Sequence, residues 1–336
     1  MTETLTILQG GYAAVQDLGR RGHSRFGLPV NGAADQYSAA VANVLVGSAA
    51  GAPLIEITLL DFAAAASRDT VIAVTGAPAE VTLNGQPVPQ WQPLLVRAGQ
   101  TIAVSGIRTG LRVYLAVQGE LRVPTLAGSV APDSILGFGH ALAAGTTIPL
   151  AGPAPQPIRG YRWGPFVPPE YLKVTVPSIS DDIEVAITDG PDAAEFDDPW
   201  SLLTNQAYTI TPQSNHVGLR LAGSTPERSH AGEVLSRGVP VGAVEVPAPG
   251  ELLVLHRGRG VTAGYPVLAV ATTTSLNILG QARPGHQVRF RRQTLAQAVA
   301  GQRMQAAAIN SLARRTTSLF PHLSEALNKS STHRGV

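Results

Sequence analysis

The sequence predicts a mainly β protein built from two tandem β-barrel domains with a few short helices. Short apolar runs follow one another closely, turn residues separate them, and a proline-rich segment divides the chain into two halves of similar length. Strands packed this closely along the chain favour a barrel or sandwich over alternating strands and helices. A chain of 336 residues is also long for one domain, so two domains are expected.

The first half supplies most of the strand signals. Strands are predicted at 71–75, 81–83, 94–96, 101–104 and 112–117. The pair Asn84-Gly85 lies between two of them and predicts a type I′ hairpin, because both central positions of that turn need positive φ. Further tight turns are expected at 97–99 and 108–110.

One helix is predicted to interrupt these strands, over 34–46. Its larger apolar side chains, at 37, 41, 44 and 45, are spaced for one helix face. Asn31 or Asp35 lies at its start and Gly47 follows its end, which is the usual asymmetry of helix caps. A helix so rich in small residues can cover the open end of a barrel.

Proline marks the division between the halves. The segment 151–169 is a predicted linker or extended crossover, since proline has no N–H group for a strand ladder. Strands are expected again at 172–176, 183–187, 208–210, 217–221, 252–255, 267–271 and 287–290. We therefore predict domains at 1–155 and 156–293, followed by a helical segment from 294 and a weakly ordered tail to residue 336.

Composition excludes several classes of function. The net charge of +2 gives no strong field for nucleic acid or an anionic membrane. Cysteine is absent, so disulfides and thiolate chemistry are excluded. No signal peptide is expected from the residues at the start of the sequence, and there is no run of about 20 apolar residues that could span a bilayer. A cytoplasmic location is expected, without nucleic-acid or membrane partners.

Several catalytic motifs are also missing. There is no Walker-type phosphate loop and no G-x-S-x-G elbow, and the eight histidines are scattered singly, so no metal site is expected. The two lysines, Lys173 and Lys329, do not lie in a biotin-carrier hairpin. This chain therefore carries no biotin of its own, and any biotin involved would arrive on a partner.

The polar, glycine-rich stretch 10–35 is the first candidate site. Asp17 and Arg20 lie three residues apart on a predicted turn. In one interpretation Asp17 caps the turn and Arg20 packs over a barrel edge. In the other, Arg20 and neighbouring N–H groups form a rim that binds an anion. The loop 27–35 then enters the predicted helix, where free N–H groups attract anions. Asp35 can equally be an ordinary acid at a helix start.

Taken in order, a series of motifs resembles the carboxyltransferase-like family that contains allophanate hydrolase subunit 2, the C component of 5-oxoprolinase and the KipA-type proteins. The resemblance covers about residues 5–293. The motifs that carry it are GGYAAVQDLGRRGHSRFGLPVNGAAD (10–35), ANVLVG (42–47), IEIT (55–58), VTGAP (74–78), LNGQPVP (83–89), VYLAVQGEL (113–121), LAGS (126–129), GFGH (137–140), SNHVGLRL (214–221), GAVEVPAPGELLVL (242–255), TAGYPVLA (262–269) and QARPGHQVRF (281–290).

The resemblance implies fold, partners and cofactor together. It implies two cyclophilin-like barrels and a homologous partner, subunit 1 (the KipI-type protein). The two subunits would open 5-oxoproline with ATP, or form the carboxyltransferase part of urea carboxylase. ATP would be bound by the partner subunit or together with it, and a lactam-utilisation protein or a biotin carboxylase would be a further partner.

The sequence departs from the family pattern mainly in its second half. Val130-Ala131-Pro132 replaces an Arg-Ser-Thr run, and Asn215-His216 replaces an Asp-Arg pair. Glu245 stands where the family has glutamine, and the segment 258–266 lacks an aspartate and a glutamine of the family pattern. These changes leave two main hypotheses open, and a β-barrel that binds some unrelated ligand is a third, because fold does not fix function.

The first hypothesis is an amide- or lactam-hydrolysing enzyme subunit that is inactive alone. The second is a non-catalytic regulatory or binding subunit, a KipA-like antagonist of its partner. In the enzyme hypothesis the catalytic candidates are Asp17, Asp35 and Glu245, which orient groups or accept a proton. The substrate-binding candidates are Gln16, Arg20, Asn31, Ser129, Arg220 and Tyr265.

Overall fold

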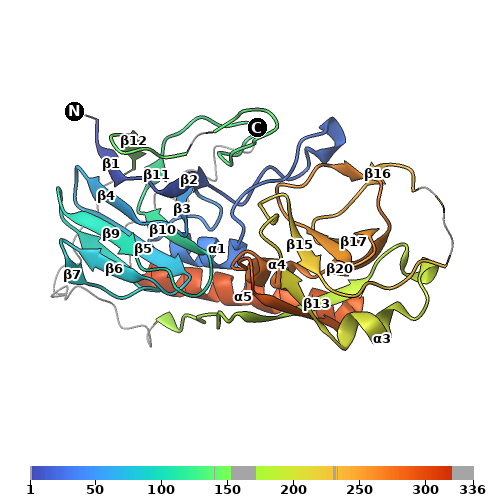
Figure 1. Cartoon of the computed structure of the whole chain (residues 1–336). Coiled ribbons are helices and arrows are strands. Elements are labelled where there is room, and N and C mark those ends of the chain that lie inside the picture. The colour runs from blue at the N-terminus through green and yellow to red at the C-terminus, as the bar shows by residue number, and fades with distance from the viewer. Residues whose placement is uncertain (1, 140, 153–171, 230–231, 233, 320–336) are drawn as a thin grey trace.

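The computed structural model describes residues 2–139, 141–152, 172–229, 232 and 234–319, and it confirms the mainly β class, in two tandem halves of which the second is a closed barrel. Strands β1 to β12 form the first half and strands β13 to β21 build most of the second (Figure 1). The predicted boundary at 155/156, most of the proline-rich crossover and the tail from 320 lie outside the described residues.

Two sheets form the first half. The seven-stranded sheet has the order β11-β12-β1-β4-β9-β6-β7 and the five-stranded sheet the order β2-β3-β10-β5-β8. The strands are β1 (Thr4–Gln9), β2 (Tyr12–Gln16), β3 (Leu54–Thr58), β4 (Phe62–Ala66), β5 (Thr70–Gly76), β6 (Glu80–Leu83), β7 (Gln86–Pro87), β8 (Pro93–Val96), β9 (Thr101–Ser105), β10 (Arg112–Val117), β11 (Glu120–Leu121) and β12 (Thr147–Ala151).

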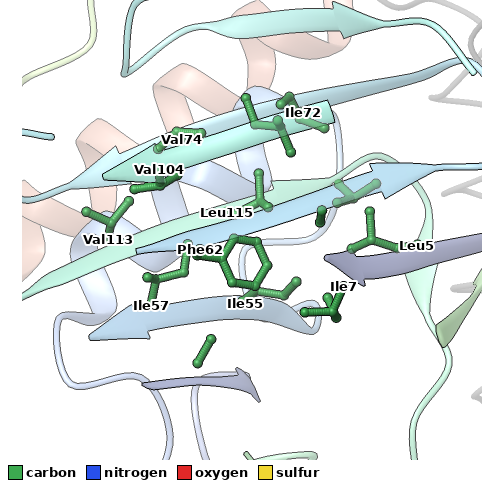
Figure 2. Packing of buried hydrophobic residues seen from close by; sticks show 14 of the residues in the cluster. Leu5, Ile7, Ile55, Ile57, Phe62, Ile72, Val74, Val104, Val113 and Leu115 are labelled. Carbon is green, nitrogen blue, oxygen red and sulfur yellow. The ribbon is translucent and has the colours of Figure 1, made fainter. Parts of the chain in front are cut away.

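The two sheets enclose one apolar core. Alternate residues of the strands point inward, as in the pairs Leu5 and Ile7 on β1 and Ile55 and Ile57 on β3, and Phe62 lies among them (Figure 2). The predicted hairpin between β6 and β7 is confirmed, since Asn84 has φ 48° and Gly85 has φ 78°. Strand alternation and turn chemistry thus account for the first half.

Helix α1 (Gln36–Leu45) confirms the predicted helix, but its place differs from the expectation of a barrel cap. It packs on the outer face of the five-stranded sheet, against Ala73 of β5 and Tyr114 of β10. Leu312 of helix α5 (Leu295–Leu319) joins the same apolar cluster. All ten residues of α1 are buried, because the sheet and other parts of the chain surround it.

The second half is a closed barrel with the order β13-β20-β17-β18-β15-β14-β21. Its first and last strands, β13 and β21, pair in parallel, and the other neighbours are antiparallel. The strands are β13 (Asp182–Asp189), β14 (Ala207–Ile210), β15 (Gly218–Ala222), β17 (Ala243–Ala248), β18 (Glu251–Leu255), β20 (Val267–Ala271) and β21 (Gln287–Arg292), with a separate ribbon of β16 (Arg237–Gly238) and β19 (Thr262–Ala263).

The strand expected at 172–176 is wrong. Leu172 is helical and Lys173 lies in a turn with φ 49°, and the segment pairs with no strand of the described chain. Its carbonyl groups instead accept hydrogen bonds from side chains, at 2.7 Å from the Tyr37 hydroxyl to Thr175 and at 2.8 Å from Arg315 to Leu172. Side chains from the two helices α1 and α5 therefore hold it.

Helices join the two halves. Helix α5 runs beneath both halves (Figure 1) and packs on α1 and on α4 (Thr273–Leu279), and it confirms the helix expected from 294. The loop after β2 leaves the first half and reaches across to the second, where the Asn31 N–H donates to the Arg257 carbonyl at 2.9 Å. Gly280, at the end of α4, approaches the backbone of Ala34 so closely that a Cβ atom there would lie 2.6 Å from its carbonyl carbon. No helix in the described residues is long and apolar enough to cross a membrane.

Candidate functional site

A cleft of about 490 Å³ lies at the junction of the two halves. Strands β2, β3 and β10 and loop residues within 132–139 and at 141 form its first side, and residues just before β15 and just after β18 come from the second half. Its lining residues are Tyr12, Ala13, Ala14, Gln16, Asn31, Gly32, Ala34, Glu56, Thr58, Arg112, Pro132, Asp133, Ser134, Gly137, Phe138, Gly139, Ala141, His216, His256, Arg257 and Gly258. Pockets between domains are common binding sites.

The chemical centre of the cleft is the pair Glu56 and Arg112. The Glu56 Oε1 lies 3.4 Å from Arg112 Nε, on the neighbouring strands β3 and β10. The other oxygen, Oε2, accepts hydrogen bonds of 2.9 Å from the Ala34 N–H and from the Tyr114 hydroxyl. Arg112 also donates to the Gly280 carbonyl. A carboxylate and a guanidinium are thus held in fixed positions at the junction.

Tyr114 connects this pair to the start of α1. Burial raises the pKa of Tyr114 well above its usual value, with the nearby Glu56 charge as a further cause, so the hydroxyl stays protonated. The hydroxyl donates to Glu56 and accepts from the Asp35 N–H at 2.9 Å. The Tyr114 hydroxyl therefore fixes both the first turn of α1 and the Glu56 carboxylate in the cleft.

Two histidines from the second half line the same cleft as neutral groups. Burial lowers the pKa of His256 to about 3, with Arg257 as a second cause, and its Nε2 lies 3.1 Å from the Leu276 carbonyl. Burial also lowers the pKa of His216, aided by the Arg112 charge, and its Nε2 lies 3.3 Å from Ser134 Oγ. His216 can thus exchange hydrogen bonds with a ligand without adding charge.

Arg257 closes the cleft on the side of the second half. Its guanidinium donates to the Ala34 carbonyl at 3.2 Å and to the Asn277 Oδ1 at 3.3 Å. Burial lowers its pKa to about 10, which leaves it charged at neutral pH. The loop that follows β2 crosses itself close to this point. Gly19 and Gly32 both have positive φ there, and their backbones approach so closely that a Cβ on Gly32 would lie 2.6 Å from the Gly19 nitrogen.

Of the substrate-binding candidates, Gln16 and Asn31 line the cleft. The Gln16 Oε1 is buried and has no hydrogen-bond partner among the described residues, so it is available to a ligand N–H group. The Asn31 amide donates to Asp133 Oδ2 at 2.9 Å, and Asn31 itself has φ 52°. Asn31 therefore fixes Asp133 as well as lining the cleft.

Asp17, Arg20 and Ser129 hold the loop behind the cleft wall. Asp17 accepts hydrogen bonds from Gly19 N, Ser129 Oγ and Val130 N at 2.7, 2.6 and 2.9 Å. Arg20 is fully buried and donates to the carbonyls of Leu126 and Ala131, with Asp133 3.4 Å from its Nη1. These three side chains do not line the cleft, and the arrangement resembles the turn-capping alternative more than an open anion rim.

Asp35 is the N-cap of α1. Its Oδ1 accepts from Ser38 N at 3.0 Å, and its Oδ2 accepts from Ser38 Oγ at 2.5 Å and from Gln281 Nε2 at 2.9 Å. Burial raises the pKa of Asp35, although its hydrogen bonds oppose this. Its side chain lines a second cavity, which shares no lining residue with the cleft.

The remaining three candidates lie elsewhere in the second half. Arg220 pairs with Glu251 on the neighbouring strand β18. Tyr265 lines a separate open groove with Phe196. Glu245 is buried on β17, where its neighbours across the strands are Leu253 and Val267. The structure does not bring these side chains into the cleft.

Sequence reasoning missed Glu56, Arg112, Asp133, His256 and Arg257 as cleft residues. One signal was present: Glu56 is a lone charge inside the apolar strand run of β3, and a buried charge needs a partner. His256 and Arg257 directly follow the apolar strand β18. The described residues hold no group of three or more histidine, aspartate or glutamate side chains arranged to bind a metal.

Known proteins resemble this chain over most of its length. The C component of 5-oxoprolinase from Escherichia coli (strain K12) is 31% identical over 297 residues, which cover 85% of this chain and 90% of that protein. The urea amidolyase of Lachancea kluyveri is also 31% identical, over 84% of this chain, but the match spans only 16% of that larger protein.

Solved structures of a urea amidolyase and a urea carboxylase also resemble this chain. The urea amidolyase of K. lactis superposes with a TM-score of 0.83 at 26% identity, over 92% of this chain and 20% of that chain. The K. lactis urea carboxylase gives the same TM-score over 29% of its chain. The family model of the carboxyltransferase domain, subdomains A and B, matches residues 26–292. This chain therefore belongs to the family of carboxyltransferase domains composed of subdomains A and B.

Proposed function

We propose that this chain is a subunit of an enzyme system that hydrolyses an amide or lactam bond with ATP, and that it acts together with a homologous subunit 1. The relatives among 5-oxoprolinase components and urea amidolyases support a subunit of an amide-hydrolysing system. The substrate we propose is 5-oxoproline, a cyclic amide, because the chain spans 90% of the first relative and only 16% of the second.

The observation that carries the proposal is the cleft, with the fixed Glu56–Arg112 pair on one side and the neutral His216 on the other. An amide or lactam presents one carbonyl oxygen and one N–H group. Arg112 supplies a donor for the carbonyl oxygen, and the unpartnered Gln16 Oε1 supplies an acceptor for the N–H. A cleft of about 490 Å³ is within the size range of small-molecule sites.

The same groups suit the chemistry of amide opening. When water adds to the carbonyl carbon, negative charge develops on the carbonyl oxygen, and the Arg112 guanidinium stabilises it. The attacking water loses a proton, which Glu56 accepts and can return to the departing ring nitrogen. Gln16 and His216 hold the amide in position. The loop 126–133 borders the cleft, and hydrogen bonds from or to Asp17, Arg20, Ser129 and Asn31 fix it. These side chains therefore support the site indirectly.

ATP belongs to the assembly of two subunits in this proposal, bound by subunit 1 or together with it. A lactam-utilisation protein would complete a ring-opening system. In a carboxyl-transfer system a biotin carboxylase would be the partner instead, and the biotin would be carried by that partner.

A regulatory function is the second candidate, and exposed apolar side chains favour it. Tyr12 and Ile135 are each 68% exposed, beside the cleft, and Leu136 next to Ile135 is 53% exposed. Apolar side chains gathered in one place mark surfaces that a partner covers. A partner that covers this surface would close the cleft, whether or not chemistry takes place in it.

The test is co-purification with subunit 1, followed by assays of ATP hydrolysis with 5-oxoproline, urea or allophanate. We expect a stable complex, turnover with one of these substrates, and little turnover by this chain alone. Glu56→Gln in the complex should abolish substrate-dependent turnover. Its matched control is Glu184→Gln, at an exposed carboxylate that pairs with Arg291 on the barrel surface.

Three results would contradict the proposal in different ways. Full turnover by the single chain would remove the need for subunit 1. A complex in which Glu56→Gln is as active as the parent would move the chemistry out of the cleft. A complex that forms but hydrolyses ATP with none of the three substrates would favour the regulatory function.

A further inference from the structure

A second cavity, of about 300 Å³, lies behind the start of α1. Helices α1, α4 and α5 and the extended segment 175–179 surround it, so it is built from both halves of the chain and the last helix. The residues that line it are Asp35, Tyr37, Thr175, Pro177, Ser178, Ile179, Thr274, Asn277, Ile278, Gln281, Gln305 and Ala308. None of these residues lines the cleft.

Its buried wall is polar. Asp35, Asn277 and Gln281 are only 3%, 6% and 3% exposed, yet all three line this cavity. Gln281 donates to Asp35, and its own carbonyl oxygen accepts from the backbone of Arg112 at 2.9 Å. Asn277 donates to Gln305 of α5 at 3.1 Å. The hydrogen bonds fix these side chains, so the wall is formed before any ligand enters.

Asp35 is the one acidic or basic side chain among the described residues that line the cavity. Its carboxylate accepts three hydrogen bonds, from Ser38 N, Ser38 Oγ and Gln281 Nε2. A carboxylate has about four acceptor positions, so one position remains for a ligand. The opposite walls carry apolar groups of Pro177, Ile179 and Ile278.

We propose that this cavity is a second binding site, separate from the cleft, for a small molecule that carries one cationic N–H donor group on an apolar body. An amidinium or a primary ammonium fits this description. The donor group contacts the Asp35 carboxylate, and the apolar body lies against Ile179 and Ile278. An anion of the same shape is excluded, because it would meet the Asp35 charge with no cation in the described lining.

Burial raises the pKa of Asp35, and a cation bound beside it would favour the ionised carboxylate. Arg257 does not line the cavity, but its guanidinium donates to the Ala34 carbonyl and to Asn277, and its charge opposes the rise in the pKa of Asp35.

The test uses three molecules of one shape and different charge: benzamidine, benzamide and benzoate, titrated into the full chain at neutral pH by calorimetry. We expect benzamidine to bind about tenfold more tightly than benzamide, the difference between a charge-assisted and a neutral hydrogen bond, and benzoate not to bind. Asp35→Asn keeps a good N-cap residue and should remove the preference for benzamidine over benzamide.

A second variant locates the binding. Ala308→Trp on α5 fills the cavity and should abolish benzamidine binding. Ala306→Trp, at an exposed position of the same helix that does not line the cavity, is the matched control and should bind benzamidine normally. The proposal is overturned if benzamidine fails to bind at about millimolar concentration. It is also overturned if benzoate binds equally well, or if Ala308→Trp leaves binding unchanged, which would assign the ligand to the cleft.

Discussion

The buried carboxyl group of Glu245 allows a direct test of how burial of a charge affects the stability of this protein. It is 0% exposed on strand β17, and neither carboxylate oxygen has a hydrogen-bond partner among the described residues. Burial raises its pKa from 4.5 to about 7, and the charge of Arg237 opposes the rise only in part. Arg237 itself is paired with Asp192. We expect Glu245→Gln to stabilise the protein at alkaline pH.

The magnitude follows from the pKa values. The folded state holds the Glu245 proton more tightly than the unfolded state, so this group's contribution to stability is complete below about pH 4.5 and is lost as the pH rises to about 7. Each unit of pKa corresponds to about 1.4 kcal/mol, so the loss is on the order of 3 kcal/mol. Glutamine has nearly the same shape and does not titrate, so Glu245→Gln should exceed the parent in stability by a similar amount at pH 8.

The assay is urea unfolding of parent and variant at a series of pH values between about 4.5 and 8. Other titrating groups are common to both proteins and cancel in the difference. Glu184→Gln is the control, because its carboxylate is exposed and the difference should stay small at every pH. The reasoning is refuted if the gain in stability of Glu245→Gln does not grow with pH.

Three further predictions concern the site. Arg20→Ala should cost about 3–5 kcal/mol in urea unfolding, because it removes a buried ion-pair partner of Asp133; an unchanged unfolding curve with lost ligand binding would restore the anion-rim interpretation. Asp35→Asn should change stability by less than about 1 kcal/mol and leave turnover of the two-subunit complex near the parent's, whereas abolished turnover with an unchanged melting temperature would make Asp35 catalytic. His256→Gln should reduce the loss of stability in acid. The pKa of the buried His256 imidazole is near 3, so the free energy of unfolding falls as the pH drops below about 6.5, by about 2 kcal/mol at pH 5. The measurement is the gap between the urea-unfolding curves at pH 7 and pH 5.

Local patterns in the sequence predicted those elements whose formation depends mainly on residues close together in the chain. The turn at Asn84-Gly85 and the helix now seen as α1 follow from φ preferences and the spacing of apolar residues, and both are confirmed. The strand expected at 172–176 failed because its apolar pattern does not reveal a missing neighbour strand. The alanine run that forms β4 carried too weak a strand preference to be recognised.

The site was harder to predict than the fold, since its contacts join distant parts of the chain. The opening stretch is rich in polar residues, and two of them, Gln16 and Asn31, do line the cleft. Arg20 looked like an anion-binding group, because nothing local shows that carbonyls of residues 126 and 131 would occupy it. Glu56 and Arg112 meet across neighbouring strands, a pairing that periodicity alone cannot identify.

The parallel seam between β13 and β21 has a consequence for how the second half is made in the cell. These strands are the first and the last of the barrel, so no stepwise addition of hairpins closes it. While the ribosome is still synthesising the strands between them, β13 presents an unpaired edge that can capture other chains. Closure then depends on a contact between the two ends of the domain, which is entropically slow to form. Pulse-labelled chains should therefore be most open to chaperones and proteases until residues 287–292 have left the exit tunnel.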